Sequence, residues 1–225
     1  MCGRYALFSD PETLADRFDV SVEAYTPTYN AAPSQSLPVV TNDDPDTLQP
    51  FQWGFVPSWA DDADPGPINA RAETADEKPM FADSLEARRC LVPCDGFYEW
   101  REEDGTNQPY YFARPDGEPF AMAGVWARYE SETRQTGLSN FADDHVEREA
   151  DPVHSFAILT TEASGVVADY HHRESVILSR AEEDEWLAGD LALDEHENDV
   201  ELAARPVSRA VNNPANDRPG LVERV

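Results

Sequence analysis

The sequence predicts an α+β domain that is mostly β-sheet, and two observations support this. Short runs rich in β-branched and aromatic residues recur along most of the chain, and the segments between them show only short helical patterns with capping residues. These elements do not follow the regular strand–helix alternation of a doubly wound fold. We therefore expect one domain over residues 1–225, with a mostly antiparallel or mixed sheet, a barrel-like core and several short helices.

The expected strands are short apolar or alternating runs bounded by turn residues. An acidic turn at 42–46 separates the first two runs. The expected strands are Leu37–Val40, Leu48–Trp53, Cys90–Trp100, Tyr110–Ala113, Phe120–Trp126 and Ser155–Thr160.

The expected helices are marked mainly by their capping residues. Ser9 and Glu12 form a candidate capping box for a helix that ends near Phe18, and Ser179 with Glu182 forms another for a helix that ends at Gly189. The other expected helices are Pro79–Ala87, a short one from about Glu162, and a weaker one at 194–204. The stretch 130–151 is polar and acidic without a period, which indicates an inserted surface loop.

Composition indicates a cytoplasmic protein without cofactors. No apolar run approaches the roughly 20 residues that span a bilayer, and the first residues lack the apolar core of a signal peptide. Three cysteines, an odd number, fit a reducing compartment better than a disulfide framework. The chain is expected to be a monomer, and nothing in the sequence identifies a protein partner.

The chain is strongly acidic, with 45 Asp and Glu against 17 Lys and Arg and a formal charge of −28. Lys78 is its only lysine. Such a surface is typical of proteins from a halophile with a high-salt cytoplasm. At about 1 M salt the Debye length is about 3 Å, so the net charge does not exclude a nucleic-acid ligand.

The most informative single residue is Cys2. Removal of Met1 would leave Cys2 with a free α-amine beside its thiol, with ordinary pKa values of about 7.7–8.0 and about 8.5. Such a 1,2-aminothiol attacks an aldehyde twice: the amine forms an imine, and the thiol then closes a five-membered thiazolidine. Alternatively, Cys2 is simply a small buried residue.

A set of motifs follows Cys2 in a fixed order. The opening Met1-Cys2-Gly3-Arg4-Tyr5 is followed by Tyr29-Asn30-Ala31-Ala32-Pro33, Trp53-Gly54, Ile68-Asn69-Ala70-Arg71-Ala72-Glu73-Thr74, Asp95-Gly96-Phe97-Tyr98-Glu99-Trp100, Tyr170-His171-His172-Arg173 and Pro206-Val207-Ser208-Arg209-Ala210-Val211-Asn212. Each motif alone is weak, but the ordered set resembles the SOS-response-associated peptidase (SRAP) family over nearly the whole chain. The resemblance implies an abasic-site shielding protein, which traps the sugar aldehyde of an abasic site in single-stranded DNA as a thiazolidine.

The resemblance also implies a catalytic set of Cys2, Asn69, Glu99 and His171. Glu99 matches the family's acid–base glutamate, and aromatic neighbours are expected to raise its pKa. Asn69 is expected to hold the reacting groups, and His171 to transfer protons. His172 stands where the family has an aspartate, and Glu174 and Ser175 stand where it has methionine or arginine and proline. His172 is therefore an alternative catalytic histidine.

Positive residues near these motifs are expected to bind DNA phosphates. Arg4 matches the family's backbone-contacting arginine, and a structural role is expected for Arg209. Trp53 and Trp59 are candidates either for base stacking or for the core. The expected DNA-binding residues are Arg4, Arg71, Arg173 and Lys78, and Asn30 and Pro33 are expected to shape the floor of the site.

No metal site is expected. Cys90 and Cys94 have three residues between them, but no second ligand pair follows at zinc-finger distance. We therefore expect both cysteines in the core.

Two other functions remain open from the sequence. One is an N-terminal-nucleophile amidotransferase or hydrolase in which the Cys2 thiolate attacks an amide and the amine is the base. The other is a single-strand binding module without catalysis. The family resemblance further implies self-cleavage ahead of Cys2, and the imine chemistry implies a weak AP-lyase activity.

Overall fold

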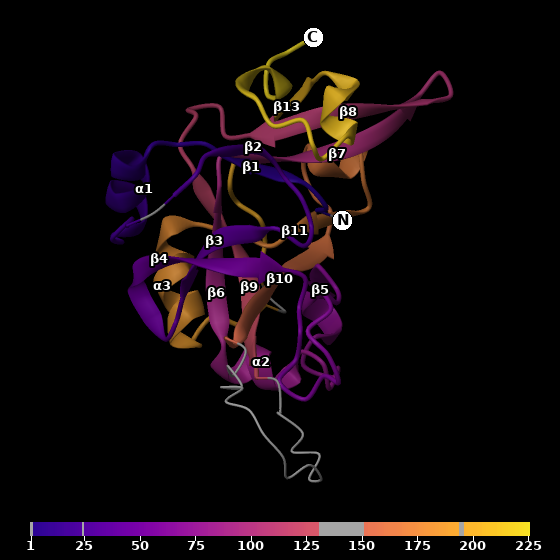
Figure 1. The fold of residues 1–225 in the computed structure, drawn as a ribbon. Helices are drawn as coiled ribbons and strands as arrows, with labels where there is room; N and C mark the ends of the chain where they lie inside the picture. The colour runs from indigo at the N-terminus through magenta and orange to yellow at the C-terminus, as the bar shows by residue number, and fades with distance from the viewer. Residues whose placement is uncertain (1, 24, 131–150, 194–195) are drawn as a thin grey trace, which may run out of the picture.

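Two β-sheets form most of the molecule (Figure 1). The structure is a computed structural model that describes residues 2–23, 25–130, 151–193 and 196–225, so nearly all of the expected insertion at 130–151 lies outside the described residues. The smaller sheet has the order β13-β8-β7-β1-β2. Its strands are β13 (Ala203–Pro206), β8 (Thr106–Ala113), β7 (Gly96–Glu103), β1 (Tyr5–Leu7) and β2 (Thr28–Ala31).

The larger sheet closes on itself. Its order is β11-β10-β4-β3-β6-β9-β12, and β10 also pairs with β9, so that β10, β4, β3, β6 and β9 form a barrel. Its strands are β3 (Ser36–Thr41), β4 (Asp44–Trp53), β5 (Asn69–Arg71), β6 (Arg89–Cys94), β9 (Phe120–Tyr129), β10 (Val153–Glu162), β11 (Arg173–Ser175) and β12 (Ile177–Leu178). The pairings of β10 with β4 and β5 are parallel, whereas its pairings with β9 and β11 are antiparallel. The predicted α+β class and barrel-like core are confirmed.

Short helices lie around the sheets. They are α1 (Pro11–Phe18), α2 (Ala82–Ala87) and α3 (Arg180–Ala188), with the 3₁₀ turns η1 (Ala72–Thr74), η2 (Val167–Asp169), η3 (Arg209–Asn212) and η4 (Pro219–Leu221). The predicted capping box of α3 is present: Ser179 and Glu182 bond to each other's backbone, and Gly189 ends the helix in a left-handed conformation with φ 88°.

The predicted capping box of α1 is wrong. Asp10 is the N-cap, because its carboxylate accepts a hydrogen bond from the Thr13 amide at 3.0 Å. The Ser9 hydroxyl instead donates to Asp95, a residue far away in the sequence. A tertiary contact therefore removes Ser9 from the role that local sequence predicts for it.

Two predicted helices are also wrong. Around Glu162 the chain is still in β10, and the next helical element is the 3₁₀ turn η2. Within 194–204, the described residues 196–202 are not helical, and Ala203 begins β13, which pairs with β8. In both places pairing with a distant strand overrides a weak local preference.

The predicted strand Cys90–Trp100 is two strands, β6 and β7, with Asp95 between them. Gly96 allows the change of sheet: a Cβ there would lie 2.3 Å from the Phe112 carbonyl oxygen. This corner brings β7 from the barrel to the smaller sheet, alongside β1. The N-terminal segment therefore lies at the junction of the two sheets (Figure 1).

Candidate functional site

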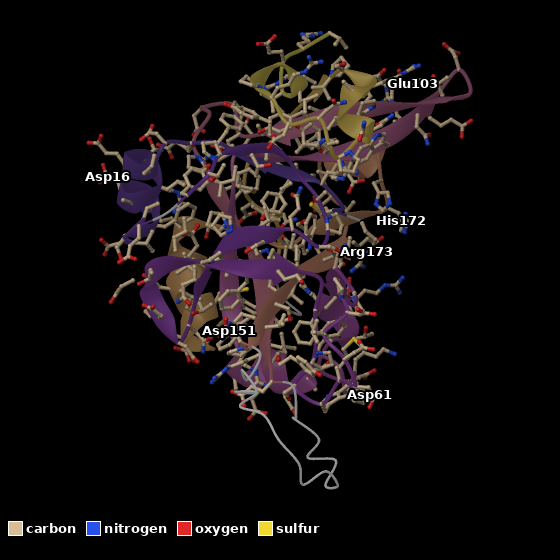
Figure 2. All side chains as sticks on the ribbon, viewed as in Figure 1. Asp16, Asp61, Glu103, Asp151, His172 and Arg173 are labelled. Carbon is tan, nitrogen blue, oxygen red and sulfur yellow. The ribbon has the colours of Figure 1, made fainter. Side chains whose placement is uncertain are left out.

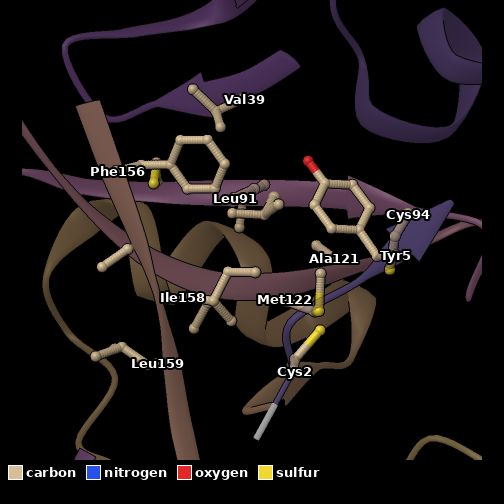
Figure 3. Packing of buried hydrophobic residues seen from close by; sticks show 14 of the residues in the cluster. Cys2, Tyr5, Val39, Leu91, Cys94, Ala121, Met122, Phe156, Ile158 and Leu159 are labelled. Carbon is tan, nitrogen blue, oxygen red and sulfur yellow. The ribbon is translucent and has the colours of Figure 1, made fainter. Parts of the chain in front are cut away.

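The Cys2 side chain lies inside the apolar core. It is 0% exposed, and its sulfur points toward the sulfur of Met122 on β9 (Figure 3). The thiol donates a weak hydrogen bond to the Arg4 carbonyl at 3.7 Å. Burial, followed by the nearby charge of Glu99, raises the pKa of the thiol to about 12. The thiol is therefore protonated near neutral pH, unlike the partly ionised cysteine that the sequence suggests.

Strand β7 places Glu99 beside the same segment. The antiparallel register pairs Tyr5 with Phe97, and the Tyr98 amide donates to the Arg4 carbonyl at 3.0 Å. If the same antiparallel register continues, Glu99 lies opposite Gly3, the residue after Cys2. Glu99 is 4% exposed, and burial raises the pKa of its carboxyl to about 7. Glu99 can therefore both give and take a proton near neutral pH.

Strand β5 places Asn69 on the other side of Cys2. β5 runs parallel to β10, with Asn69 opposite Ile158. The Asn69 side-chain amide donates to the Cys2 carbonyl at 3.0 Å, which fixes the backbone at Cys2. Its side-chain oxygen is buried and has no hydrogen-bond partner in the described part of the chain. This oxygen can accept a hydrogen bond from a bound hydroxyl or amine.

The two histidines differ in their surroundings. His171 is half-buried, and its Nδ1 lies 2.9 Å from both the amide nitrogen and the carbonyl oxygen of Arg173. Burial lowers the pKa of His171, so the ring is neutral at pH 7. His172 is exposed and stacks on His171 with ring centroids 4.4 Å apart. The contacts to Nδ1 fix the orientation of the His171 ring, whereas His172 has no such contact in the described residues.

Two of the four predicted phosphate-binding cations already have protein partners. Arg4 donates to Asn30 at 2.9 Å and to the Val211 carbonyl at 3.1 Å. Arg173 forms a two-pronged ion pair with Glu73 at 2.6 and 2.8 Å, which ties β11 to η1. Both arginines therefore hold the walls of the site together, a role that the sequence pattern does not reveal.

The other two, Arg71 and Lys78, are exposed and form no side-chain ion pair with the described residues. The pKa of His172 is lowered first by the charge of His171, with smaller effects that include the charge of Arg71, so Arg71 lies within electrostatic range of His172. Figure 2 shows His172 and Arg173 at one edge of the molecule.

The remaining candidate residues are also partly buried in the protein and partly on its surface. Trp53 is 0% exposed and its indole donates to the Ile68 carbonyl at 3.0 Å, whereas Trp59 is 61% exposed. Trp53 is thus a core residue, and Trp59 can stack on a base. Asn30 is 1% exposed and donates to three carbonyls of the C-terminal segment, at residues 211, 213 and 216. Pro33 is partly exposed.

Cys90 and Cys94 are buried core residues, and burial raises the pKa of Cys90. Among the described residues no group of His, Cys, Asp and Glu is arranged to hold a metal ion. Arg209 donates to the Thr106 hydroxyl at 2.8 Å, a contact within the protein. In the described ranges, none of the helices has both the length and the apolar character needed to cross a membrane.

Comparisons with known proteins identify the family and the fold of the chain. A family model described as SOS response associated peptidase (SRAP) matches residues 1–214. The chain is 34% identical to the abasic site processing protein YoqW of Bacillus subtilis, with 99% of each chain covered, and 30% identical to the abasic site processing protein YedK of Escherichia coli, with 100% of each covered. A crystal structure of a Bacteroides thetaiotaomicron protein has the same fold, with a TM-score of 0.79, 24% identity and 100% coverage of both chains.

Proposed function

This chain belongs to the SOS response associated peptidase (SRAP) family, and from that premise we propose that it captures abasic sites in single-stranded DNA as a covalent thiazolidine at Cys2. The observation that carries the proposal is the grouping of a buried thiol, a carboxyl with a pKa of about 7 and a positioning amide around one residue. Relatives that are named abasic site processing proteins support abasic DNA as the partner.

The first step uses the α-amine of Cys2, which removal of Met1 exposes. An abasic deoxyribose in its open form carries an aldehyde at C1′, and the amine adds to this carbon. Glu99 in its acid form protonates the departing hydroxyl, which leaves as water, and the nitrogen then releases its remaining proton to the solvent to give the imine. His171 assists proton transfer as the sugar opens, and the Asn69 side chain holds the Cys2 backbone in place.

The second step uses the thiol. The sulfur adds to C1′ of the imine and closes the five-membered ring. Because the thiol pKa is about 12, this step needs a base, and the Glu99 carboxylate left after the first step is available to take the proton. The buried position of the thiol therefore places it second in the order of reaction.

Exposed cations would hold the DNA strand. Arg71 and Lys78 have side chains that are available to phosphates, and Trp59 offers an exposed ring to a base. Arg4 and Arg173 act by holding the protein segments that carry the site, through Asn30 and Glu73. A single strand is favoured because the sugar must reach a thiol in the protein core.

Two side reactions belong to the same proposal. Release of the residue ahead of Cys2 would be a self-cleavage, consistent with the peptidase in the family description. The imine also acidifies the C2′ protons of the sugar, so slow β-elimination gives the protein a weak lyase activity. Both reactions need Glu99 as the acid or base.

The alternative of a Cys2 amidotransferase is weakened by the pKa of the thiol. Such an enzyme needs a thiolate as its first nucleophile, and burial disfavours the thiolate here. Incubation with glutamine should therefore release no ammonia.

The test of the proposal is a denaturing gel of the protein mixed with an oligonucleotide that contains one abasic site. A slow-migrating species should form with the single strand, should survive denaturation and should be absent with Cys2→Ala. Cys90→Ala is the matched control, because it removes another buried thiol that the mechanism does not use. A shifted band that persists in Cys2→Ala would overturn the proposal.

A further inference from the structure

The hydroxyl of Ser175 is an unexplained feature of the site. Ser175 is the last residue of β11 and is 0% exposed, and its Oγ is buried without a hydrogen-bond partner of good geometry in the described residues. Buried polar side chains in proteins are normally hydrogen-bonded. The neighbouring Glu174 follows this rule, since its carboxylate accepts from the Ser164 amide and hydroxyl, each at 2.9 Å. A purely structural role gives no account of the Ser175 hydroxyl.

The backbone of Ser175 is held firmly next to the nucleophile. Ser175 pairs with Thr160 of β10, and its carbonyl accepts a hydrogen bond from the Asn198 side chain at 3.0 Å. Ile177, two residues further, pairs with Met122, toward which the Cys2 sulfur points (Figure 3). The hydroxyl is thus carried by a fixed strand beside the thiol.

The Ser175 side chain lies close enough to the Cys2 thiol to affect its pKa. Burial has the largest effect on the Cys2 thiol and raises its pKa, whereas hydrogen bonding to the Ser175 side chain lowers it. The thiol donates to the Arg4 carbonyl, with the sulfur 3.7 Å from the oxygen, so the sulfur lone pairs are left to accept a hydrogen bond. The Ser175 hydroxyl needs only a rotation of its hydrogen to donate one.

We propose that the Ser175 hydroxyl is a catalytic group that donates a hydrogen bond to the Cys2 sulfur while the thiol loses its proton and closes the thiazolidine ring. This inference rests on the proposed function and concerns its second step alone. In an apolar surrounding, a developing thiolate gains far more from one fixed donor than it would in water.

The step balances as an addition of S–H across the C=N bond. The sulfur lone pair forms the bond to C1′, and the π electrons of the imine move to nitrogen. The thiol proton passes to the Glu99 carboxylate and from there to the nitrogen. No group leaves and nothing is oxidised or reduced; Ser175 keeps its own proton throughout.

The test measures the two steps separately with the full-length protein and an abasic single-stranded oligonucleotide. Borohydride reduction traps the imine, whereas the species that resists denaturation without borohydride reports ring closure. Ser175→Ala should form the imine at the wild-type rate and close the ring roughly ten- to a hundredfold more slowly, because a hydrogen bond to a charged group is lost. The pH for half-maximal closure should rise.

Two further comparisons separate a chemical role from a structural one. Ser175→Thr keeps the hydroxyl, so its ring closure should proceed at nearly the wild-type rate. Ser175→Val has nearly the same shape as the threonine variant but lacks the hydroxyl, so its ring closure should be slow. Ser155→Ala removes another buried hydroxyl, one that accepts from the Val56 amide at 2.8 Å, and should leave closure unchanged.

The outcomes are distinguishable. Equal closure rates and pH profiles for the wild type, Ser175→Ala and Ser175→Val would overturn the role of Ser175 while the proposed function stands. Equal slowing of both steps in Ser175→Ala and Ser175→Val would also overturn it, since that result indicates a general distortion of the site. A wild-type protein that forms no imine and no adduct would overturn the proposed function.

Discussion

Burial of the Cys2 side chain gives the two nucleophiles of that residue different roles. The α-amine of an N-terminal residue has an ordinary pKa of about 7.7–8.0, whereas the buried thiol has a pKa of about 12. In the proposed mechanism the amine is therefore the group that meets the aldehyde first. The thiol lies in the core with Met122 beside it (Figure 3), and in the proposed mechanism it reacts only once an imine carbon lies next to it.

A first prediction concerns Glu99. Imine formation needs the neutral amine and the acid form of Glu99, whose pKa is about 7, so its rate should rise with pH as the amine loses its proton and fall as Glu99 ionises. Glu99→Gln should slow imine formation by about 10²–10⁴-fold and remove the falling limb. Single-turnover rates between pH 5 and 10, with borohydride trapping, measure both effects.

The control for this prediction is Glu102→Gln, which changes an exposed glutamate on the same strand. It should leave the rate and its pH profile unchanged. A Glu99→Gln variant with the full wild-type profile would show that another group transfers the proton.

At the scale of elements, a buried ion pair joins α1 to α3. Arg17 and Glu183 form two hydrogen bonds at 2.8 and 2.6 Å, and Arg17 also donates to the Pro119 carbonyl at 3.1 Å. Their side chains are 10% and 7% exposed. The pair holds two helices of distant sequence position against the barrel.

The second prediction follows from this burial. Glu183→Gln should lower the free energy of unfolding by about 3–5 kcal/mol, because it leaves the Arg17 charge buried without its partner. Denaturant titration measures this difference. Asp116→Asn breaks a largely exposed pair with Arg114 and should change stability little. Equal effects of the two substitutions would contradict the role given to burial.

The sequence predicted the strands well where apolar alternation is strong, as in β4, β9 and β10. It failed where distant contacts decide the local structure. Ser9 is drawn to Asp95, and the chain from Ala203 pairs with β8 rather than forming a helix. Such contacts leave no local signal.

The same reasoning applies to the site. Motif order singled out Cys2, Asn69 and Glu99, and the structure groups them. Partners such as Glu73, which takes up Arg173, were not predicted because exposed carboxylates are everywhere in this chain. The pKa of the Cys2 thiol could not be predicted from the sequence either, because it depends on how deeply the folded barrel buries the side chain.

For the whole molecule, the dominant property is a net charge of −28. Figure 2 shows acidic side chains such as Asp16, Asp61 and Glu103 pointing outward on several sides. At low ionic strength these charges repel one another and also repel DNA, and both effects weaken as salt shortens the Debye length. At high salt, Arg71 and Lys78 can attract a phosphate only within the shortened Debye length.

A third prediction follows for stability. The midpoint of thermal unfolding should rise as KCl is increased from about 0.1 M to about 1 M, since the Debye length falls from about 10 Å to about 3 Å. Circular dichroism melting curves measure this, with sucrose as a control for general exclusion effects. A midpoint that stays constant or falls would show that surface repulsion does not limit stability here.

A fourth prediction concerns DNA capture. Arg71→Gln and Lys78→Gln should each slow adduct formation on abasic single strands at moderate salt, with a weaker effect near 1 M. Arg88→Gln is the control, because Arg88 is a partly buried arginine that donates to Ser84. Equal rates for the wild type, Arg71→Gln and Lys78→Gln would place the DNA on another face.

The most direct measurement of the central claim is mass spectrometry of the proteolysed adduct between the protein and an abasic oligonucleotide. The account predicts that the sugar is attached to a peptide that begins with Cys2, that one water is lost in its formation, and that borohydride adds no hydrogen because no C=N bond remains. Attachment at another residue, or a Cys2 adduct that gains two hydrogens from borohydride at completion, would contradict it.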